Sequence, residues 1–333
     1  FYPPDPGSMS VSTMGGNIAE NSGGLRGLKY GTTKKYVMGL EVYSETGDCV
    51  PTGHFVTGCQ LGYNVNDLLI ASEGTLALTS RAMLKLVAPP KASKAMMAIF
   101  SEVPRASQAV AGIIAAHVVP CTLEFMDHAT INYVEDYVNI GLPRDAAAIL
   151  LIEVDGHPAQ VADEAVIVEK VLKETGALEV VVAKDAQEKN KIWEARRVAI
   201  PALARCRPTL MLEDATVPRS QIPAMIKALD EIAARHHVTI GTFGHAGDGN
   251  LHPSILCDRR DKEEFGRVER AVNDLFNTAL ELGGTLSGEH GIGLSKKKWL
   301  EQETSKGTLQ FMRRMRTAFD PKKLLNASKI VSI

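Results

Sequence analysis

The segment from residue 244 to residue 252 constrains the fold of this chain more than any other stretch. It reads Gly-His-Ala-Gly-Asp-Gly-Asn-Leu-His and is flanked on both sides by apolar, partly β-branched residues that are typical of strands. Its central pair, Asp248-Gly249, is a strong signal for a two-residue type I′ turn between antiparallel strands. A turn centred on this pair predicts that His245 lies directly opposite His252, with Cβ atoms about 4.5–5.5 Å apart.

Two imidazoles at that separation can bind a common metal ion, because zinc–nitrogen bonds are about 2.0–2.1 Å long. A second cluster, Ser-Gly-Glu-His-Gly-Ile-Gly at residues 287–293, places Glu289 beside His290 between glycines. In an extended segment these neighbours point to opposite sides, so one can complete a His/His/Glu metal site while the other faces a substrate. The alternatives are two histidines that only flank a surface turn and a glycine-rich loop with an ordinary surface pair.

Composition excludes several classes of protein. The chain has 333 residues, of which 45% are hydrophobic and 23% are charged, and these values are typical of a globular protein with two domains. A net charge of −2 without a sustained basic stretch argues against nucleic-acid binding. No apolar run approaches the roughly 18 residues of a transmembrane helix. Five scattered cysteines without Cys-x-x-Cys spacing favour a reducing compartment, so we expect a cytoplasmic protein.

Residues 91–285 alternate between strand-like and helix-like hydrophobic periods. Two β-α-β passes of similar length predict an α+β domain with a duplicated ferredoxin-like, antiparallel sheet and helices on one face. The predicted strands are 95–100, 121–126, 147–154, 178–182, 210–217, 238–243 and 251–256. The predicted helices are 104–117, 129–137, 158–175, 185–203, 219–236 and 261–282.

Residues 1–90 are rich in glycine and turns, and Pro89-Pro90 marks a domain boundary. The run Met-Gly-Gly-Asn-Ile-Ala-Glu-Asn-Ser-Gly-Gly at 14–24 predicts a loop whose backbone N–H groups can crowd against a phosphate or a flat ring. It is not a Gly-x-Gly-x-x-Gly motif between a strand and a helix, which argues against a nicotinamide Rossmann site. A plain structural loop is the alternative.

The predicted helix at 185–203 carries Ile-Trp-Glu-Ala-Arg-Arg, which ends in Arg196 and Arg197. A guanidinium group binds a carboxylate through two parallel hydrogen bonds, so an arginine here is a candidate for holding an acidic substrate. The alternative is a solvated helix face.

Taken together, five motifs resemble those of one family in order and spacing. They are Gly-Gly-Asn-Ile-Ala-Glu-Asn-Ser-Gly-Gly, Ser-Glu-Gly-Thr-Leu, Gly-His-x-Gly-Asp-Gly-Asn-Leu-His, Gly-Glu-His-Gly-Ile-Gly and Phe-Asp-Pro-x-x-x-Leu-Asn. From Phe1 to its C-terminus the chain resembles FAD-linked 2-hydroxy-acid dehydrogenases of the glycolate oxidase D-subunit and D-lactate dehydrogenase type, in the vanillyl-alcohol-oxidase fold group.

The resemblance implies a division into three parts. Residues 1–90 would be the second half of an FAD-binding domain, 91–285 a substrate-binding cap, and 286–333 a segment that returns to the flavin. Members of the family begin with another subdomain that cradles the FAD pyrophosphate. We therefore expect that this chain lacks the first half of the FAD-binding domain, either as a fragment or truncated gene product, or because another polypeptide completes the site.

The resemblance also assigns roles to individual residues. His245, His252 and Glu289 would hold a divalent metal, with zinc as the first choice and manganese or iron as alternatives. His290 would be the general base, and Arg196 would hold the substrate carboxylate. The residues that would bind FAD are Pro4, Asp5, Gly16, Asn17, Ala19, Asn21, Gly24 and Asn326.

The predicted reaction oxidises a D-2-hydroxy acid, of the glycolate, D-lactate or D-2-hydroxyglutarate class, to the 2-oxo acid. The metal would lower the pKa of the substrate hydroxyl, His290 would take its proton, and hydride would pass to the flavin. The electron acceptor would be an electron-transfer protein, a quinone or a partner subunit, and a homodimer is one possible assembly. Two alternatives stay open: a truncated, non-catalytic subunit or remnant of such an enzyme, and a metal-dependent hydrolase without flavin.

Overall fold

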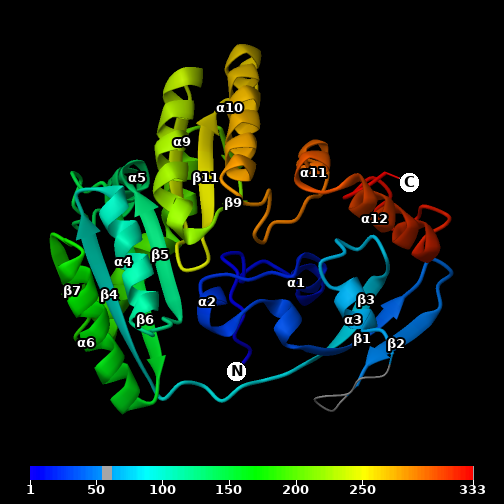
Figure 1. Cartoon of the computed structure of the whole chain (residues 1–333), viewed down its shortest axis with the longest axis horizontal. Helices are drawn as coiled ribbons and strands as arrows, with labels where there is room; N and C mark the ends of the chain where they lie inside the picture. The colour runs from blue at the N-terminus through cyan, green and yellow to red at the C-terminus, as the bar shows by residue number, and fades with distance from the viewer. Residues whose placement is uncertain (55–61, 333) are drawn as a thin grey trace. The chain divides into compact units, whose positions relative to one another are not determined.

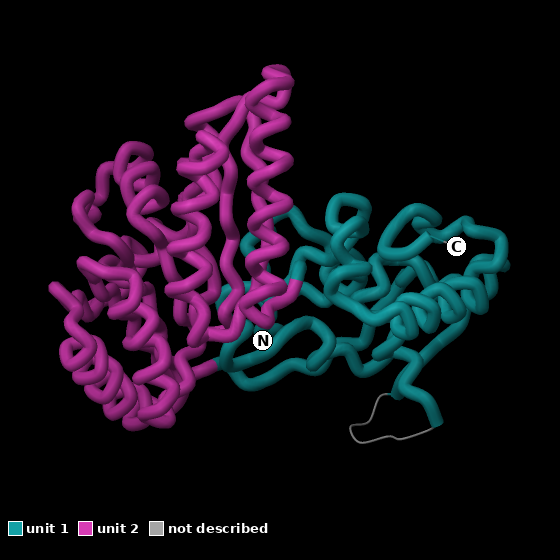
Figure 2. Tube along the Cα trace, turned by 45° about the horizontal axis from the view of Figure 1, so that its top comes forward, with its two compact units in different colours: residues 1–89, 286–333 teal, residues 90–285 magenta. Residues whose placement is uncertain are grey.

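The computed structural model divides into two compact units, which Figure 2 draws in separate colours. Unit 1 comprises Phe1–Pro89 and Leu286–Ile333, and unit 2 comprises Pro90–Thr285. The structure describes residues 1–54 and 62–332, so Cys59 lies outside the described residues. None of the described helices has the length and hydrophobicity that a membrane-spanning segment requires.

Unit 2 is built around an eight-stranded antiparallel sheet in the order β7-β4-β6-β5-β10-β11-β8, with β9 paired to the start of β11 (Figure 1). Its strands are β4 (Ala92–Phe100), β5 (Thr122–Asp127), β6 (Ala148–Gly156), β7 (Glu179–Val182), β8 (Thr209–Leu212), β9 (Ala215–Thr216), β10 (Thr239–His245) and β11 (Asn250–Cys257). Its helices are α4 (Val103–Ala115), α5 (His128–Val138), α6 (Pro158–Glu174), α7 (Ala186–Arg197), α8 (Ala199–Cys206), the 3-10 turn η2 (Arg219–Gln221), α9 (Ile222–His236) and α10 (Lys262–Glu281).

The sheet of unit 2 contains one pattern twice. The first copy runs β4-α4-β5-β6-α6-β7, and its strands lie in the order β7-β4-β6-β5. The second copy runs β8-α9-β10-β11-α10, and its strands lie in the order β10-β11-β8. The copies join where β5 pairs with β10. The predicted α+β fold with a duplicated ferredoxin-like, antiparallel sheet is therefore confirmed.

Helices cover both faces of this sheet, so the expectation of helices on one face is wrong. Helices α4, α6, α9 and α10 pack in one layer, whereas α5, α7 and α8 pack against one another and against β4, β10 and β11. The latter three helices are additions to the two β-α-β passes. Their apolar side chains, including Ile131, Trp193 and Leu203, are buried in a core with Phe243 of β10 and so cover the second face.

The helix predicted at 185–203 forms as two helices, α7 and α8, which are separated at Val198. Pro201 lies in the first turn of α8 and has no N–H for the carbonyl four residues earlier, so the hydrogen-bond ladder of α7 cannot continue through it. Asp185 caps the start of α7 through its side chain. The break leaves Arg196 in the last turn of α7.

Strands β10 and β11 form the predicted hairpin with a different register. Residues 246–249 connect the strands, so His245 pairs with Asn250, and Phe243 pairs with His252. The predicted pairing of His245 with His252 is therefore wrong.

The register differs because a backbone N–H of the turn donates its hydrogen bond to a third strand, β5. Gly247 donates its backbone N–H to the carbonyl of Leu123 at 3.2 Å, so this N–H is not used within the hairpin. The shift amounts to two residues, and side chains alternate between the faces of a sheet with a period of two. His245 and His252 therefore lie on the same face of the sheet, as they would in the predicted register.

Unit 1 contains a three-stranded antiparallel sheet in the order β2-β1-β3. Its strands are β1 (Val37–Tyr43), β2 (Cys49–Gly53) and β3 (Leu78–Leu84). Its helices are α1 (Met14–Glu20), α2 (Gly27–Tyr30), the 3-10 turn η1 (Thr33–Lys35), α3 (Val65–Leu69), α11 (Lys297–Glu303) and α12 (Lys306–Phe319). A core that includes Ile18, Leu40, Val42 and Leu69 joins α1 and α3 to the sheet.

The run at 14–24, predicted as a loop, folds in its first part into α1. Thr13 caps this helix by accepting a hydrogen bond from the N–H of Gly16, and Ile18 is buried in the core. The helix ends at Asn21, whose φ of 56° is left-handed. Capping and burial therefore stabilise a short helix against the cost of its two glycines.

Asp127 at the end of β5 connects α5 to the sheet. Its Oδ1 accepts the N–H of Thr130 at 2.8 Å, and its Oδ2 accepts the N–H of Thr242 at 2.7 Å. Burial raises the pKa of Asp127 from 3.8 to about 6, although these hydrogen bonds act to lower it.

Gly249→Ala is expected to destabilise unit 2 more than Gly283→Ala does. Both glycines are left-handed, with φ of +77° and +75°, but a Cβ on Gly249 would lie 2.0 Å from the carbonyl oxygen of Val217, whereas no atom of the described residues lies within 4 Å of a Cβ on Gly283. We expect a loss of about 1–2 kcal/mol at Gly283 and roughly 2 kcal/mol more at Gly249, where the backbone must move. Urea unfolding measures both, and equal losses would contradict this close approach.

Asp127→Asn is expected to flatten the pH dependence of stability. The folded pKa of Asp127, about 6, lies above the unfolded value of 3.8. The folded state then binds more protons between these values, so stability falls as pH rises through this window. Relative to Asp127→Asn, the wild type should lose roughly 2 kcal/mol between about pH 4.5 and 7 in urea unfolding. A constant difference between the two proteins would show that the folded pKa is not raised.

Candidate active site

A cluster of polar side chains lies on one face of the eight-stranded sheet, where β5, β10 and β11 are neighbours. Paired residues of adjacent strands share a face, and Glu124 pairs with His245 while Phe243 pairs with His252. Helix α7 packs over the same face and adds Arg196. The sheet thus brings together three predicted site residues from distant parts of unit 2.

The two predicted metal-binding histidines of unit 2 are close together. The ring centroids of His245 and His252 are 5.1 Å apart, and the rings are nearly perpendicular at 87°. Both residues are buried, with exposures of 6% and 4%. Two imidazoles in this arrangement can each direct one nitrogen at a common ion, as a two-histidine metal site requires.

Glu124 of β5, which the sequence analysis did not identify, is a central member of the cluster. Its side chain is completely buried, and its two oxygens accept hydrogen bonds from His245 Nδ1 and from Arg196 Nε, both at 2.6 Å. Burial acts to raise the pKa of Glu124, but His245 and Arg196 outweigh it and hold the pKa below its usual value. The sequence signal is a single carboxylate within the apolar strand Thr-Leu-Glu-Phe-Met.

Arg196 lies in the cluster, whereas Arg197 does not. Arg196 is 8% exposed, and its guanidinium carbon lies 4.6 Å from the centroid of the Phe243 ring. Arg197 is exposed and donates its Nε to the carbonyl of Trp193. Within the described residues, the Nη atoms of Arg196 make no hydrogen bond, so they are suited to a second carboxylate.

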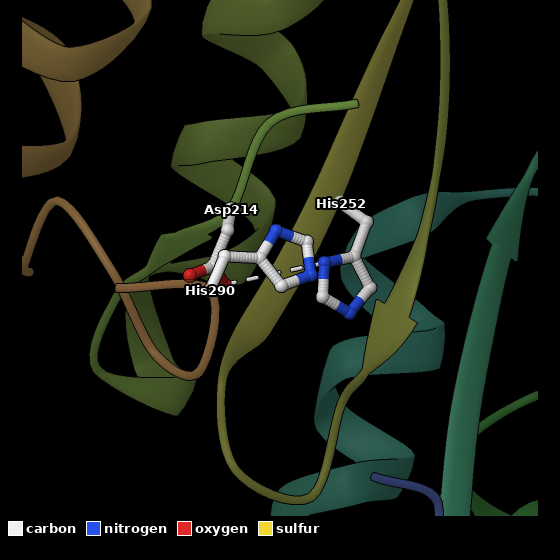
Figure 3. Close-up of side chains that lie close together, drawn as sticks. All are labelled: Asp214, His252 and His290. Atoms are coloured by element: carbon white, nitrogen blue, oxygen red, sulfur yellow. Dashed lines mark ion pairs between the residues drawn. The ribbon is translucent and has the colours of Figure 1, made fainter. Parts of the chain in front are cut away.

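Asp214 is a further residue that the sequence analysis missed. The strand predicted at 210–217 is interrupted between β8 and β9, and Asp214 lies at this interruption. It is completely buried, and its Oδ1 is 4.0 Å from Nδ1 of His252 (Figure 3). The sequence signal was an acidic residue within an apolar strand pattern.

Glu289 and His290 belong to unit 1, in the loop that precedes α11. The carboxylate of Glu73 orders this loop by accepting the N–H groups of Ile292 at 2.6 Å and Gly293 at 2.8 Å. Glu289 lies next to the glycine-rich run, because a Cβ on Gly23 would be 3.3 Å from Glu289 Oε2. The structure of unit 1 therefore brings the Gly-Glu-His-Gly motif to the segment that we expect to bind FAD.

Unit 1 contains a cavity of about 360 Å³ beside this loop. Its polar lining includes Glu20, Asn21, Glu73 and Glu289. Its apolar lining includes Leu68, Leu76, Leu300, Met312, Ile330 and Val331. Burial, together with the nearby carboxylate of Glu73, raises the pKa of Glu20 from 4.5 to about 7, although Lys329 acts to lower it. The cavity thus combines apolar walls with carboxyl and amide groups, as small-molecule sites commonly do.

The predicted FAD-binding residues all lie in unit 1, but only Asn21 lines this cavity. Asn326 is connected to it, because Asn326 Nδ2 donates to the carbonyl of Glu73 at 2.6 Å. Asp5 forms a bridge with Gly24, and the Gly24 site has no space for a Cβ because the Asp5 carbonyl would be 2.3 Å away. Of the other four, Gly16, Asn17 and Ala19 lie in α1, and Pro4 lies in the N-terminal segment.

Comparison with protein families identifies two regions of the chain. The model of FAD linked oxidases, C-terminal domain, matches residues 89–330. The model of an FAD binding domain matches residues 1–53. FAD is therefore the cofactor that both matched families have in common.

Curated relatives agree with these families. Glycolate oxidase subunit GlcD of Bacillus subtilis (strain 168) is 48% identical over 99% of this chain and 70% of the relative. GlcD of Escherichia coli (strain K12) is 35% identical over 99% of this chain and 66% of the relative. D-lactate dehydrogenase of Anaerostipes hadrus is 32% identical over 99% of this chain and 71% of the relative. The chain thus spans about two thirds of the length of these proteins.

Solved structures show the same fold at low sequence identity. The 4-ethylphenol oxidase of Gulosibacter chungangensis superposes with a TM-score of 0.74 at 13% identity, covering 95% of this chain and 69% of that one. For p-cresol methylhydroxylase the TM-score is 0.70 at 15% identity, with the same coverage. The expected vanillyl-alcohol-oxidase type of fold is confirmed, and with it the resemblance drawn from the motifs. The chain belongs to the family of FAD-linked oxidases, among the oxidoreductases related to glycolate oxidase subunit GlcD and D-lactate dehydrogenase.

Proposed function

We propose that this protein oxidises a D-2-hydroxy acid of the glycolate, D-lactate or D-2-hydroxyglutarate class to the 2-oxo acid. The pair of hydrogen bonds to Glu124 carries the proposal. They hold Arg196, which is suited to binding a substrate carboxylate, beside His245, which is suited to binding a metal. In this proposal unit 2 is the substrate-binding cap, residues 1–90 belong to the FAD-binding domain, and residues 286–333 return to the flavin.

The donor set of unit 2 fits a divalent metal, with zinc as the first choice. His245 and His252 supply two imidazoles, and the carboxylate beside His245 is the kind of partner that orients a metal-binding histidine. The Oδ1 of Asn250, at the same end of the hairpin, is buried without a hydrogen-bond partner among the described residues. Manganese and iron remain alternatives for nitrogen and carboxylate ligands.

Glu289 is proposed as the third ligand, and chain connectivity supports it. Thr285 at the end of unit 2 forms a bridge with Thr216, which lies two residues after Asp214. Glu289 follows Thr285 by four residues, so the two Cα atoms are at most about 14 Å apart. Three protein ligands with an open position are the arrangement of a catalytic metal site.

The cavity in unit 1 fits part of a flavin. Its apolar walls suit a flat ring, and Glu20 Oε2 is buried with no hydrogen-bond partner among the described residues. Asn21 adds an amide that can donate or accept a hydrogen bond. These features support FAD binding by residues 1–90, with Asn326 adjoining the cavity through Glu73.

In the proposed mechanism the residues of this chain bind, orient and deprotonate the substrate. Arg196 would grip the substrate carboxylate through its Nη atoms and fix the orientation of C2. His290 would remove the hydroxyl proton, for which an imidazole is suited near neutral pH. When bound, FAD supplies the acceptor for the hydride equivalent from C2, and a divalent metal makes the substrate hydroxyl more acidic. Loss of one proton and one hydride converts the 2-hydroxy acid to the 2-oxo acid.

Reoxidation requires a second partner, for which we propose an electron-transfer protein, a quinone or a partner subunit. The curated relatives named GlcD are subunits of glycolate oxidase, which favours the last of these. We propose a cytoplasmic location from the cysteine pattern and retain a homodimer as one possible assembly.

The proposal is tested by adding FAD and Zn²⁺ to the purified chain, desalting it, and measuring the flavin absorption and the metal content of the same sample. Glycolate and D-lactate are then assayed as substrates, with L-lactate as the control. Retained flavin and selective oxidation of a D-2-hydroxy acid support the proposal. Metal without flavin would favour the hydrolase or a non-catalytic subunit, and equal rates with L-lactate would contradict the assigned stereochemistry.

His290→Ala is expected to lower turnover of the FAD-loaded protein by about 100-fold or more, because general bases contribute on the order of 10²–10⁴ to rate. Its metal content should stay unchanged. Glu289→Ala serves as the matched control on the adjacent residue and should lose the metal. Loss of metal in His290→Ala with retention in Glu289→Ala would exchange the roles of the two residues.

A further inference from the structure

We propose that Glu124 is a positioning residue that sets His245 for metal binding and Arg196 for substrate binding at the same time. The inference rests on the proposed function of these two residues and extends it to a third residue that touches neither metal nor substrate. All the contacts that support it lie within unit 2.

Glu124 fixes which nitrogen of His245 is available for a metal. A carboxylate only accepts hydrogen bonds, so the contact of 2.6 Å between Glu124 Oε1 and His245 Nδ1 places a proton on Nδ1. The lone pair of a neutral ring is then on Nε2. A carboxylate on the far nitrogen also holds the plane of the ring and makes it a stronger ligand.

The second oxygen of Glu124 fixes the direction of Arg196. Oε2 accepts from Nε at 2.6 Å, and the guanidinium group lies against the face of the Phe243 ring at 4.6 Å. These two contacts determine the plane of the guanidinium group. Its Nη atoms, which are unused among the described residues, therefore keep one orientation, as bidentate binding of a substrate carboxylate requires.

Asp214 lies near Nδ1 of His252, as Glu124 lies near Nδ1 of His245. Its Oδ1 is 4.0 Å from His252 Nδ1, and its side chain is completely buried. A distance of 4.0 Å is too long for a hydrogen bond, so this contact does not fix the tautomer of His252. The positioning role is therefore inferred for Glu124 alone.

Glu153 provides a matched comparison because it binds the same helix, and its side chain has no histidine as a hydrogen-bond partner among the described residues. It lies on the neighbouring strand β6, paired with Thr122 of β5, and on the same face of the sheet as Glu124. Its oxygens accept from Lys189 Nζ at 2.6 Å and Trp193 Nε1 at 2.7 Å, both on α7. If Glu124 served only to dock α7, its replacement would behave like replacement of Glu153.

Glu124→Gln should disturb both partners while changing little volume. A glutamine has one carbonyl oxygen, whereas Arg196 Nε and His245 Nδ1 both donate. If the carbonyl faces Arg196, the amide NH₂ faces His245 and moves the ring proton to Nε2, which removes the metal-binding lone pair. If the carbonyl faces His245, the NH₂ repels Arg196.

The experiment measures Zn²⁺ affinity of the full chain by competition with a chromophoric chelator, for wild type, Glu124→Gln and Glu153→Gln. We expect Glu124→Gln to weaken Zn²⁺ binding about 10- to 100-fold, as loss of a partner of a metal-binding histidine does. Glu153→Gln should stay within about twofold of wild type, as expected of a residue that contacts no ligand. Thermal unfolding of the metal-free proteins checks that both variants are folded.

A second measurement, independent of metal, follows the imidazole ¹⁵N shifts of His245 in metal-free protein. Wild type and Glu153→Gln should show the proton on Nδ1, and Glu124→Gln should show a shift toward Nε2. Equal shifts and equal Zn²⁺ affinity in all three proteins would overturn the role of Glu124. An equal loss of affinity in both variants would also overturn it, because docking of α7 would then be the common cause.

The same data separate this inference from the proposed function. If wild type binds Zn²⁺ and Glu124→Gln binds it equally well, only the positioning role fails. If wild type binds neither Zn²⁺ nor Mn²⁺ nor Fe²⁺, the metal-assisted function fails and the role of Glu124 in metal binding fails with it.

Discussion

The candidate site of unit 2 depends on a buried charge that two donors compensate. Transfer of an isolated carboxylate into a protein interior is strongly unfavourable. Glu124 is nevertheless completely buried, because His245 and Arg196 each donate a hydrogen bond at 2.6 Å. The carboxylate needs both donors, and both donors need the carboxylate to keep their orientation. The strand that carries Glu124, β5, lies in the middle of the sheet between β6 and β10.

The duplicated sheet explains why the site forms where it does. The two ferredoxin-like halves join at the pairing of β5 with β10. Glu124 lies on one side of this junction, and His245 lies opposite it on the other. The additional helices α5, α7 and α8 then cover this face and exclude water from the cluster, while α7 adds Arg196. The second half supplies both histidines, whereas Glu124 comes from β5 of the first half, so neither half alone contains the Glu124–His245 pair.

Much of the fold could be predicted from periodicity, because each β-α-β pass carries its own apolar pattern. The errors occur where long-range contacts outweigh local signals. The Asp248-Gly249 turn gave the wrong register because Leu123 takes the N–H of Gly247. The helix at 185–203 is divided at Val198, and α1 forms in a glycine-rich run because Thr13 and Ile18 cap and bury it. The second helical layer was missed because local periodicity does not say which face of a sheet a helix covers.

The sequence by itself determined the family, the identity of the candidate metal-binding side chains, and the α+β sheet, because motifs and hydrophobic periods are local properties of a chain. Only the tertiary structure decided which arginine joins the cluster, since Arg196 and Arg197 are adjacent in sequence but differ in the direction that α7 gives them. It also revealed Glu124 and Asp214, because their importance lies in contacts with residues up to 121 positions away. Burial turns these two ordinary acidic residues into parts of a site, and burial is a property of the whole fold.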